Sequence, residues 1–128
     1  FALPRTIELA QKDGYPAPAA TLPADAEISV GGLKLHVFYP GAGHSPDNIV
    51  VWLPSSKVLF GGCFVKAAEA TGMGNTAEAD LPSWERGTLE LIRRYGKANI
   101  VIPGHGAVAG PALLEHTLRL IRQNKHLG

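Results

Sequence analysis

Cysteine, clustered charge and long apolar runs are scarce in this sequence. The 128 residues include one cysteine, which excludes a disulfide within the chain and leaves the redox compartment undetermined. The formal net charge is +1 and no run of lysine and arginine occurs, so the composition indicates neither a nucleic-acid partner nor binding to an anionic membrane. No stretch approaches the roughly 18 consecutive apolar residues of a membrane span. These absences leave a globular α/β or α+β domain.

Apolar residues make up 45% of the chain, which is typical of a globular protein that buries a core. A chain of 128 residues corresponds to one domain or to part of one. It begins at Phe1 without the charged and apolar regions of a signal peptide. We therefore expect either that a leader has been removed or that the chain is a fragment.

Apolar periodicity and turn residues predict the order helix, β-hairpin, strand, strand, helix, strand, helix. The Gly31-Gly32 pair is a strong signal for a two-residue hairpin turn, and Asp80 is typical of a helix N-cap. The expected elements are a helix over 4–12, hairpin strands over 27–30 and 33–39, strands over 49–53, 58–60 and 99–102, a helix through 83–95 and a last helix from Pro111.

Burial is expected to follow the apolar pattern within each element. Alternate residues of the strand over 33–39, beginning with Leu33, are expected to form the more buried face. Gly96 is expected at the C′ position that follows a helix. Residues 16–25 are expected to form a surface connector and residues 67–80 a long surface loop. The apolar stripes of the last two helices are expected to be Trp84, Leu89, Leu91, Ile92 and Tyr95, and Leu113, Leu114, Thr117, Leu118 and Ile121.

Three potential metal ligands lie beside glycine or proline at the ends of predicted apolar runs, namely His44, Cys63 and His105. A sheet passes side chains into loops at such positions, and functional sites are commonly built there. Two imidazoles and one thiol favour a soft divalent metal, above all zinc. Each residue also has a structural alternative. A loop histidine can serve only as a hydrogen-bonding group, and a cysteine can pack as a small apolar residue.

Two polar residues near these candidates could contact a substrate. Lys66 follows Cys63 in the same predicted loop, where its charge could bind an anionic group, and the alternative is a solvated surface lysine. Asn75 could donate a hydrogen bond to a developing oxyanion, and the alternative is a turn residue. The remaining histidines are interpreted as structural or solvated, and they are His36, His116 and His126.

Three segments carry a resemblance to a known family: PGAGHSPDNIVVWLPSSKVLFGGCFVK, GMGNTAEADLPSW and IVIPGHG. They closely resemble the zinc metallo-β-lactamases, in the subclass whose second zinc has a cysteine ligand. Other hydrolases of that superfamily generally carry aspartate in place of Cys63, so the combination of Cys63, Lys66 and Asn75 narrows the function. The resemblance implies an α/β fold of the αββα sandwich type. Residues 1–128 would supply the C-terminal αβ half of that single domain.

The resemblance also implies a role for each candidate residue. His44 would be a ligand of the first zinc, and Cys63 and His105 would be ligands of the second. Lys66 would bind the carboxylate beside the β-lactam nitrogen, and Asn75 would help to polarise the lactam carbonyl. The expected activity is zinc-dependent hydrolysis of the β-lactam amide bond by a metal-bound hydroxide. Such an enzyme confers antibiotic resistance and acts in the bacterial periplasm.

The His-x-His-x-Asp element that supplies the family's other ligands does not occur in this chain. We therefore expect a complementary N-terminal half as its partner, with a two-zinc site completed between the halves. Without that half, the chain is expected to expose an apolar sheet face, to bind metal weakly and to hydrolyse little. The alternatives are a thioester or phosphodiester hydrolase of the same superfamily, or an inactive fragment. The spectrum among penicillins, cephalosporins and carbapenems does not follow from this sequence.

Overall fold

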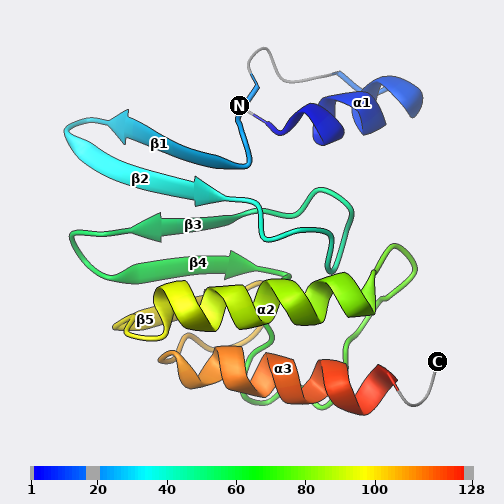
Figure 1. Ribbon diagram of the computed structural model, residues 1–128, viewed down its shortest axis with the longest axis vertical. Helices are drawn as coiled ribbons and strands as arrows, with labels where there is room; N and C mark the ends of the chain where they lie inside the picture. Colours follow the sequence, from blue (N-terminus) through cyan, green and yellow to red (C-terminus); the bar gives the residue numbers. More distant parts are fainter. Residues whose placement is uncertain (1, 17–20, 126–128) are drawn as a thin grey trace.

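Helices and strands follow one another in the predicted order in the computed structural model, which describes residues 2–16 and 21–125. Within these residues, five strands form one sheet in the order β1-β2-β3-β4-β5 (Figure 1). Strands β1 to β4 pair antiparallel, and β5 pairs parallel to β4 after the crossover through helix α2. The elements are α1 (Pro4–Lys12), β1 (Asp25–Val30), β2 (Leu33–Phe38), β3 (Val50–Leu53), β4 (Val58–Gly62), α2 (Leu81–Tyr95), β5 (Ile100–Pro103) and α3 (Ala112–Lys125).

The predicted hairpin between β1 and β2 is confirmed. Gly31 and Gly32 have φ values of 55° and 80°, which a two-residue turn needs and which residues with a Cβ rarely adopt. Val30 is therefore paired with Leu33 directly across the turn. Strand β4 runs two residues beyond its predicted end at Phe60, because Gly62 still pairs with Pro103 of β5.

Helices α2 and α3 pack side by side against the same face of the sheet (Figure 1). The core between these layers contains completely buried apolar side chains, among them Leu59, Trp84, Leu91, Val101, Leu114 and Ile121. All five predicted apolar positions of α3 are buried. Each helix alone could bury only a stripe, so the fold depends on the pairing of helices and sheet. No helix in the described part of the chain has the length and apolar character needed to cross a membrane.

The structure confirms the prediction for the start of α2 and corrects the prediction for its end. At its start, the Asp80 carboxylate accepts the N–H of Ser83 at 2.9 Å, which is the predicted N-cap. At its end, Gly96 is the C-cap residue, with a φ of −61° and an N–H that donates to the Ile92 carbonyl, so the prediction that it takes the C′ position is wrong. Glycine is required there for space, because a Cβ would lie 2.6 Å from the Ile92 carbonyl oxygen. Leu89, predicted in the buried stripe, is 45% exposed.

The sheet face that lies away from α2 and α3 is apolar and open. Strand register places alternate residues of each strand on this face, and several are large exposed hydrophobic residues, namely Val30, Leu33, Phe60 and Ile100. This exposed face agrees with the expectation from the sequence.

The predicted buried face of β2 is wrong in detail, because Leu33 is exposed while Val37 and Phe38 on opposite faces are both buried. Burial therefore increases along β2 toward its C-terminal end.

The two segments predicted to be loops agree with the structure to different extents. Residues 17–20 of the connector lie outside the described residues, and Thr21 forms an isolated bridge with Ala2. Residues 67–80 contain no helix or strand, as predicted. They are not wholly a surface loop, because Ala67 and Met73 are buried. The loop is thus anchored in the core at its first half, which restricts its movement beside the site.

Candidate metal centre

Cys63 and His105 meet because β4 and β5 are parallel neighbours whose carboxyl ends lie at the same edge of the sheet. The ladder pairs Gly62 with Pro103, and each ligand candidate follows its strand end within two residues. The Cys63 Sγ atom lies 3.6 Å from the His105 Nε2 atom. Gly104 permits this approach, because a Cβ there would lie 2.8 Å from Sγ and 2.6 Å from the Cys63 backbone nitrogen.

The separation of these two atoms fits zinc. Two tetrahedral ligands at about 2.3 Å (sulfur) and about 2.0 Å (nitrogen) from one zinc ion are separated by about 3.5 Å. The observed Sγ–Nε2 distance is 3.6 Å. Both side chains are accessible, since Cys63 is partly exposed and His105 is exposed. A soft thiolate beside an imidazole is also a donor set that zinc prefers. The Sγ–Nε2 distance is therefore compatible with both atoms binding one zinc ion.

His44 lies in the loop between β2 and β3 and packs against α2. Its ring meets that of Trp84 edge to face at a centroid distance of 5.8 Å. Its Nδ1 atom is the one buried side-chain nitrogen or oxygen without a hydrogen bond among the described residues. Burial lowers the pKa of His44, and the positive charges of Lys66 and His105 lower it further. These effects favour the neutral imidazole, which is the form that binds a metal.

The loop that carries His44 is held by a local hydrogen-bond network. The Asn48 side-chain oxygen accepts the Ser45 N–H at 3.0 Å, and its amide nitrogen donates to the Gly41 carbonyl at 2.9 Å. Asp47 accepts the Ser45 hydroxyl at 3.1 Å. These bonds close the loop around His44. The Asp80 N–H also donates to the Gly43 carbonyl at 2.9 Å, so the ring position is set by the loop itself, by Trp84 and by the start of α2.

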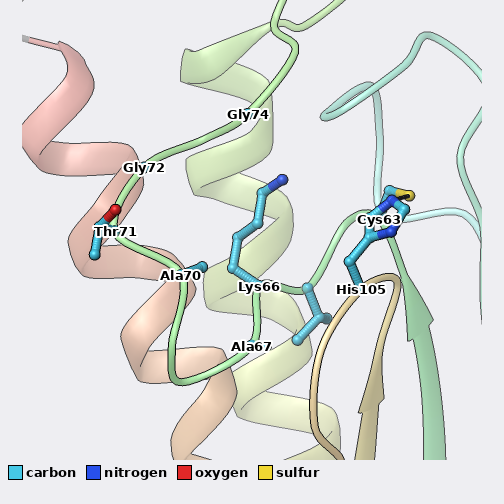
Figure 2. Close-up of a pocket in the computed structure, with 9 residues that line it drawn as sticks. Cys63, Lys66, Ala67, Ala70, Thr71, Gly72, Gly74 and His105 are labelled. Carbon is cyan, nitrogen blue, oxygen red and sulfur yellow. Dashed lines mark hydrogen bonds between the residues drawn. The ribbon is translucent and has the colours of Figure 1, made fainter.

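The three ligand candidates do not form one cluster. Within residues 2–16 and 21–125, no three side chains of His, Cys, Asp or Glu lie together as a metal site requires. Cys63 and His105 line a cavity of about 440 Å³ together with Lys66 (Figure 2). His44 lines a separate cavity of about 120 Å³ together with Asn75 and Glu78. The candidate ligands therefore fall into two places, with Cys63 and His105 at one cavity and His44 at the other.

Lys66 extends into the larger cavity from the loop that follows Cys63 (Figure 2). Its ammonium nitrogen lies 5.7 Å from the centroid of the Trp84 ring. Burial lowers the pKa of Lys66, and the nearby Cys63 acts in the opposite direction. Lys66 is thus a partly buried cation that faces a cavity, which suits the recognition of an anionic group and argues against the solvated alternative.

Both helices hold the backbone segment between Cys63 and Lys66. From α2, the Trp84 indole N–H donates to the Phe64 carbonyl at 2.9 Å. From α3, the Thr117 hydroxyl accepts the Lys66 backbone N–H at 2.8 Å and donates to the Leu113 carbonyl. Sequence reasoning missed this function of Trp84 and Thr117, which appeared only as members of apolar stripes. A threonine at a position otherwise occupied by leucine and isoleucine was the one available signal.

The remaining polar candidates take local structural positions. Asn75 lines the cavity beside His44, and its side-chain oxygen accepts the Ala77 N–H at 3.0 Å as in an Asx turn. The ring of His36 contacts the Asp25 carboxylate. The ring of His116 donates to the Ala70 carbonyl at 2.9 Å. His126 lies outside the described residues.

These observations define an α/β domain with a candidate zinc centre at one end of its sheet. The chain belongs to the metallo-beta-lactamase superfamily, whose family model matches residues 4–105. It is 45% identical over 117 residues to a metallo-beta-lactamase type 2 from Bacillus cereus, covering 91% of this chain and 46% of that protein. A second metallo-beta-lactamase type 2, from Bacteroides fragilis, is 40% identical over 124 residues. These residues cover 96% of this chain and 49% of the Bacteroides fragilis protein.

Solved structures give the same result for the fold. A metallo-beta-lactamase from Pontibacter korlensis superposes with a TM-score of 0.90 at 44% identity, covering 94% of this chain and 56% of that one. The fold assignment made from sequence is therefore confirmed. The chain spans about half the length of the curated relatives it matches.

Proposed function

We propose that this chain takes part in the zinc-dependent hydrolysis of β-lactam amide bonds and supplies part of a two-zinc site. The separation of 3.6 Å between Cys63 Sγ and His105 Nε2 is the observation that carries the proposal. It matches the spacing of two ligands on one zinc ion. The names of the similar proteins from Bacillus cereus and Bacteroides fragilis support the substrate class.

In this proposal Cys63 and His105 would hold one zinc and His44 would contribute to holding another. Zinc supplies a nucleophilic water at neutral pH and positive charge for the oxygen and nitrogen of the scissile amide. Lys66 binds the substrate carboxylate, because its ammonium group faces the cavity beside Cys63 and His105. Asn75, beside His44, donates its amide N–H to the lactam carbonyl oxygen.

We further propose that a complementary segment completes the site and covers the sheet. A catalytic zinc normally takes three protein ligands, whereas this chain offers Cys63 and His105 to one ion and His44 to the other. The exposed apolar face with Val30, Leu33, Phe60 and Ile100 supports the same conclusion, because large open apolar faces are rare in isolated domains. The complementary segment would therefore bury this face and add the missing donors.

The test is hydrolysis of a chromogenic cephalosporin by the complete protein. We expect a chelator to abolish the activity, zinc to restore it, and Cys63→Ser to reduce both zinc content and turnover. Lys66→Ala should raise KM for carboxylate-bearing substrates, whereas the exposed control Lys97→Ala should leave KM unchanged. Undiminished hydrolysis after metal removal and in Cys63→Ser would refute the proposal.

A further inference from the structure

An exposed glutamate connects the two loops that carry Cys63 and His105. The Ala107 backbone N–H donates to the Glu69 carboxylate oxygen Oε1 at 2.8 Å. Glu69 follows Cys63 in the first loop, and Ala107 follows His105 in the second. The carboxylate thus joins segments that are 38 residues apart in sequence.

The backbone next to Ala107 leaves room for the Glu69 carboxylate. Gly106 has a φ of +93°, a conformation that residues with a Cβ rarely adopt. A Cβ at Gly106 would lie 2.3 Å from Glu69 Oε1 and 2.6 Å from the Ala67 Cβ. The absence of a side chain at Gly106 therefore permits the close contact. The hydrogen bond from Ala107 lowers the pKa of Glu69, so the carboxylate is ionised at neutral pH and its hydrogen bond is charge-assisted.

Little else holds the His105 loop. The β4–β5 ladder ends at Pro103, and backbone pairing resumes only where Ala109 bridges Val101. All residues from His105 to Val108 are exposed. Among the described residues, the bond to Glu69 is the one backbone hydrogen bond found between these two points. Rotation of this loop would move the His105 ring relative to Cys63.

The loop that carries Glu69 is itself well anchored. The His116 ring on α3 donates to the Ala70 carbonyl at 2.9 Å, and the Ala70 N–H donates to the Ala67 carbonyl at 3.0 Å. Ala67 is 3% exposed and so is part of the packed interior. Glu69 therefore extends from a fixed support and can restrain the weaker loop.

We infer that Glu69 is a positioning residue that holds the His105 loop against the Cys63 loop and so sets the distance between Sγ and Nε2. This inference rests on the proposed function only in assigning that pair to a zinc ion. Partners that orient metal ligands without contacting the metal commonly change metal affinity by about 10- to 100-fold. Because Glu69 is exposed and acts through the backbone, we expect the low end of this range.

The test compares Glu69→Ala with Glu69→Gln and with the control Glu115→Ala in the complete protein. Glu115 is exposed on α3, so its replacement removes the same charge from a position outside the two loops. The first measurement is hydrogen exchange of the Ala107 amide in metal-free protein. Glu69→Ala should lower its protection several-fold, while Glu69→Gln, whose amide oxygen can still accept, should retain most of it.

The second measurement is cobalt(II) binding, which is monitored through the thiolate-to-metal charge-transfer absorption of Cys63. Glu69→Ala should weaken cobalt binding by about tenfold and alter the band, with rescue in Glu69→Gln and no effect in Glu115→Ala. Unchanged protection of Ala107 in Glu69→Ala would overturn the inference, and so would lost protection with unchanged cobalt affinity. If even the unmodified protein lacks a thiolate band, the proposed zinc site fails, and hydrogen exchange alone then decides whether Glu69 holds the loop.

Discussion

Replacing Thr117 with valine isolates one hydrogen bond that holds the site to the core. The Thr117 side chain is completely buried, and its hydroxyl accepts the Lys66 backbone N–H at 2.8 Å. Valine has nearly the same shape, so the substitution removes the hydroxyl and leaves almost no cavity. The Leu113 carbonyl loses the Thr117 hydroxyl as a donor but remains part of helix α3. The group left without a partner is therefore the Lys66 N–H.

The expected cost follows from the burial of that N–H group. An unsatisfied buried donor costs about 1–3 kcal/mol, and the Lys66 hydrogen bond is partly buried. We expect Thr117→Val to lower the free energy of unfolding by about 1–2 kcal/mol. Thr88→Val is the matched control, because Thr88 is also buried in a helix but only donates to the Trp84 carbonyl of its own helix. The control should therefore cost less than about 1 kcal/mol.

Urea unfolding, monitored by tryptophan fluorescence, measures the free energy of unfolding of both variants. Trp84 is a suitable probe because it is buried beside the segment between Cys63 and Lys66. The two variants should have similar m-values, so the difference between their midpoints reports stability directly. Equal destabilisation by Thr117→Val and Thr88→Val would show that the bond to Lys66 contributes nothing. A lower m-value only in Thr117→Val would show instead that the native state itself has loosened, which the loss of a single hydrogen bond would not cause.

Three further changes test other parts of the fold. Asp80→Ala should lower the free energy of unfolding by about 0.5–2 kcal/mol through loss of the α2 N-cap, with Asp80→Asn retaining most of the stability in urea titrations. Gly43→Ala should cost about 1–3 kcal/mol because a Cβ would lie 2.4 Å from the Phe64 ring, whereas Gly72→Ala has open space; equal thermal midpoints would contradict this. Hydrogen bonds from Lys125 and Arg122 lower the pKa of Glu85 from its ordinary value of 4.5, so its contribution is present above about pH 4.5 and is lost as the pH falls through the lowered value. The stability difference between the unmodified protein and Glu85→Gln should accordingly shrink on acidification, and a difference that stays constant as the pH falls would exclude this linkage.

Local signals in the sequence were sufficient for most elements. The Gly31-Gly32 turn, the Asp80 cap and the apolar stripe of α3 were predicted because each depends on residues within one or two turns of chain. Errors arose where neighbours distant in sequence decide burial. Leu89 matches the helical period but is exposed, and Leu33 matches the strand period but lies on the open face.

The sequence by itself determined which donors are available and that Cys63 and His105 lie where a strand passes into a loop. The same expectation for His44 was wrong, because His44 lies in the middle of the loop between β2 and β3. Strand ends and glycines are encoded locally, so His44, Cys63 and His105 could be identified as candidates without any coordinates. Only the tertiary structure decided that Cys63 and His105 lie 3.6 Å apart while His44 lines another cavity. It also decided that Thr117 and Glu69 hold the two loops in place. These contacts join residues 38 to 51 positions apart, and such distances are set by the packing of helices on the sheet rather than by any local preference.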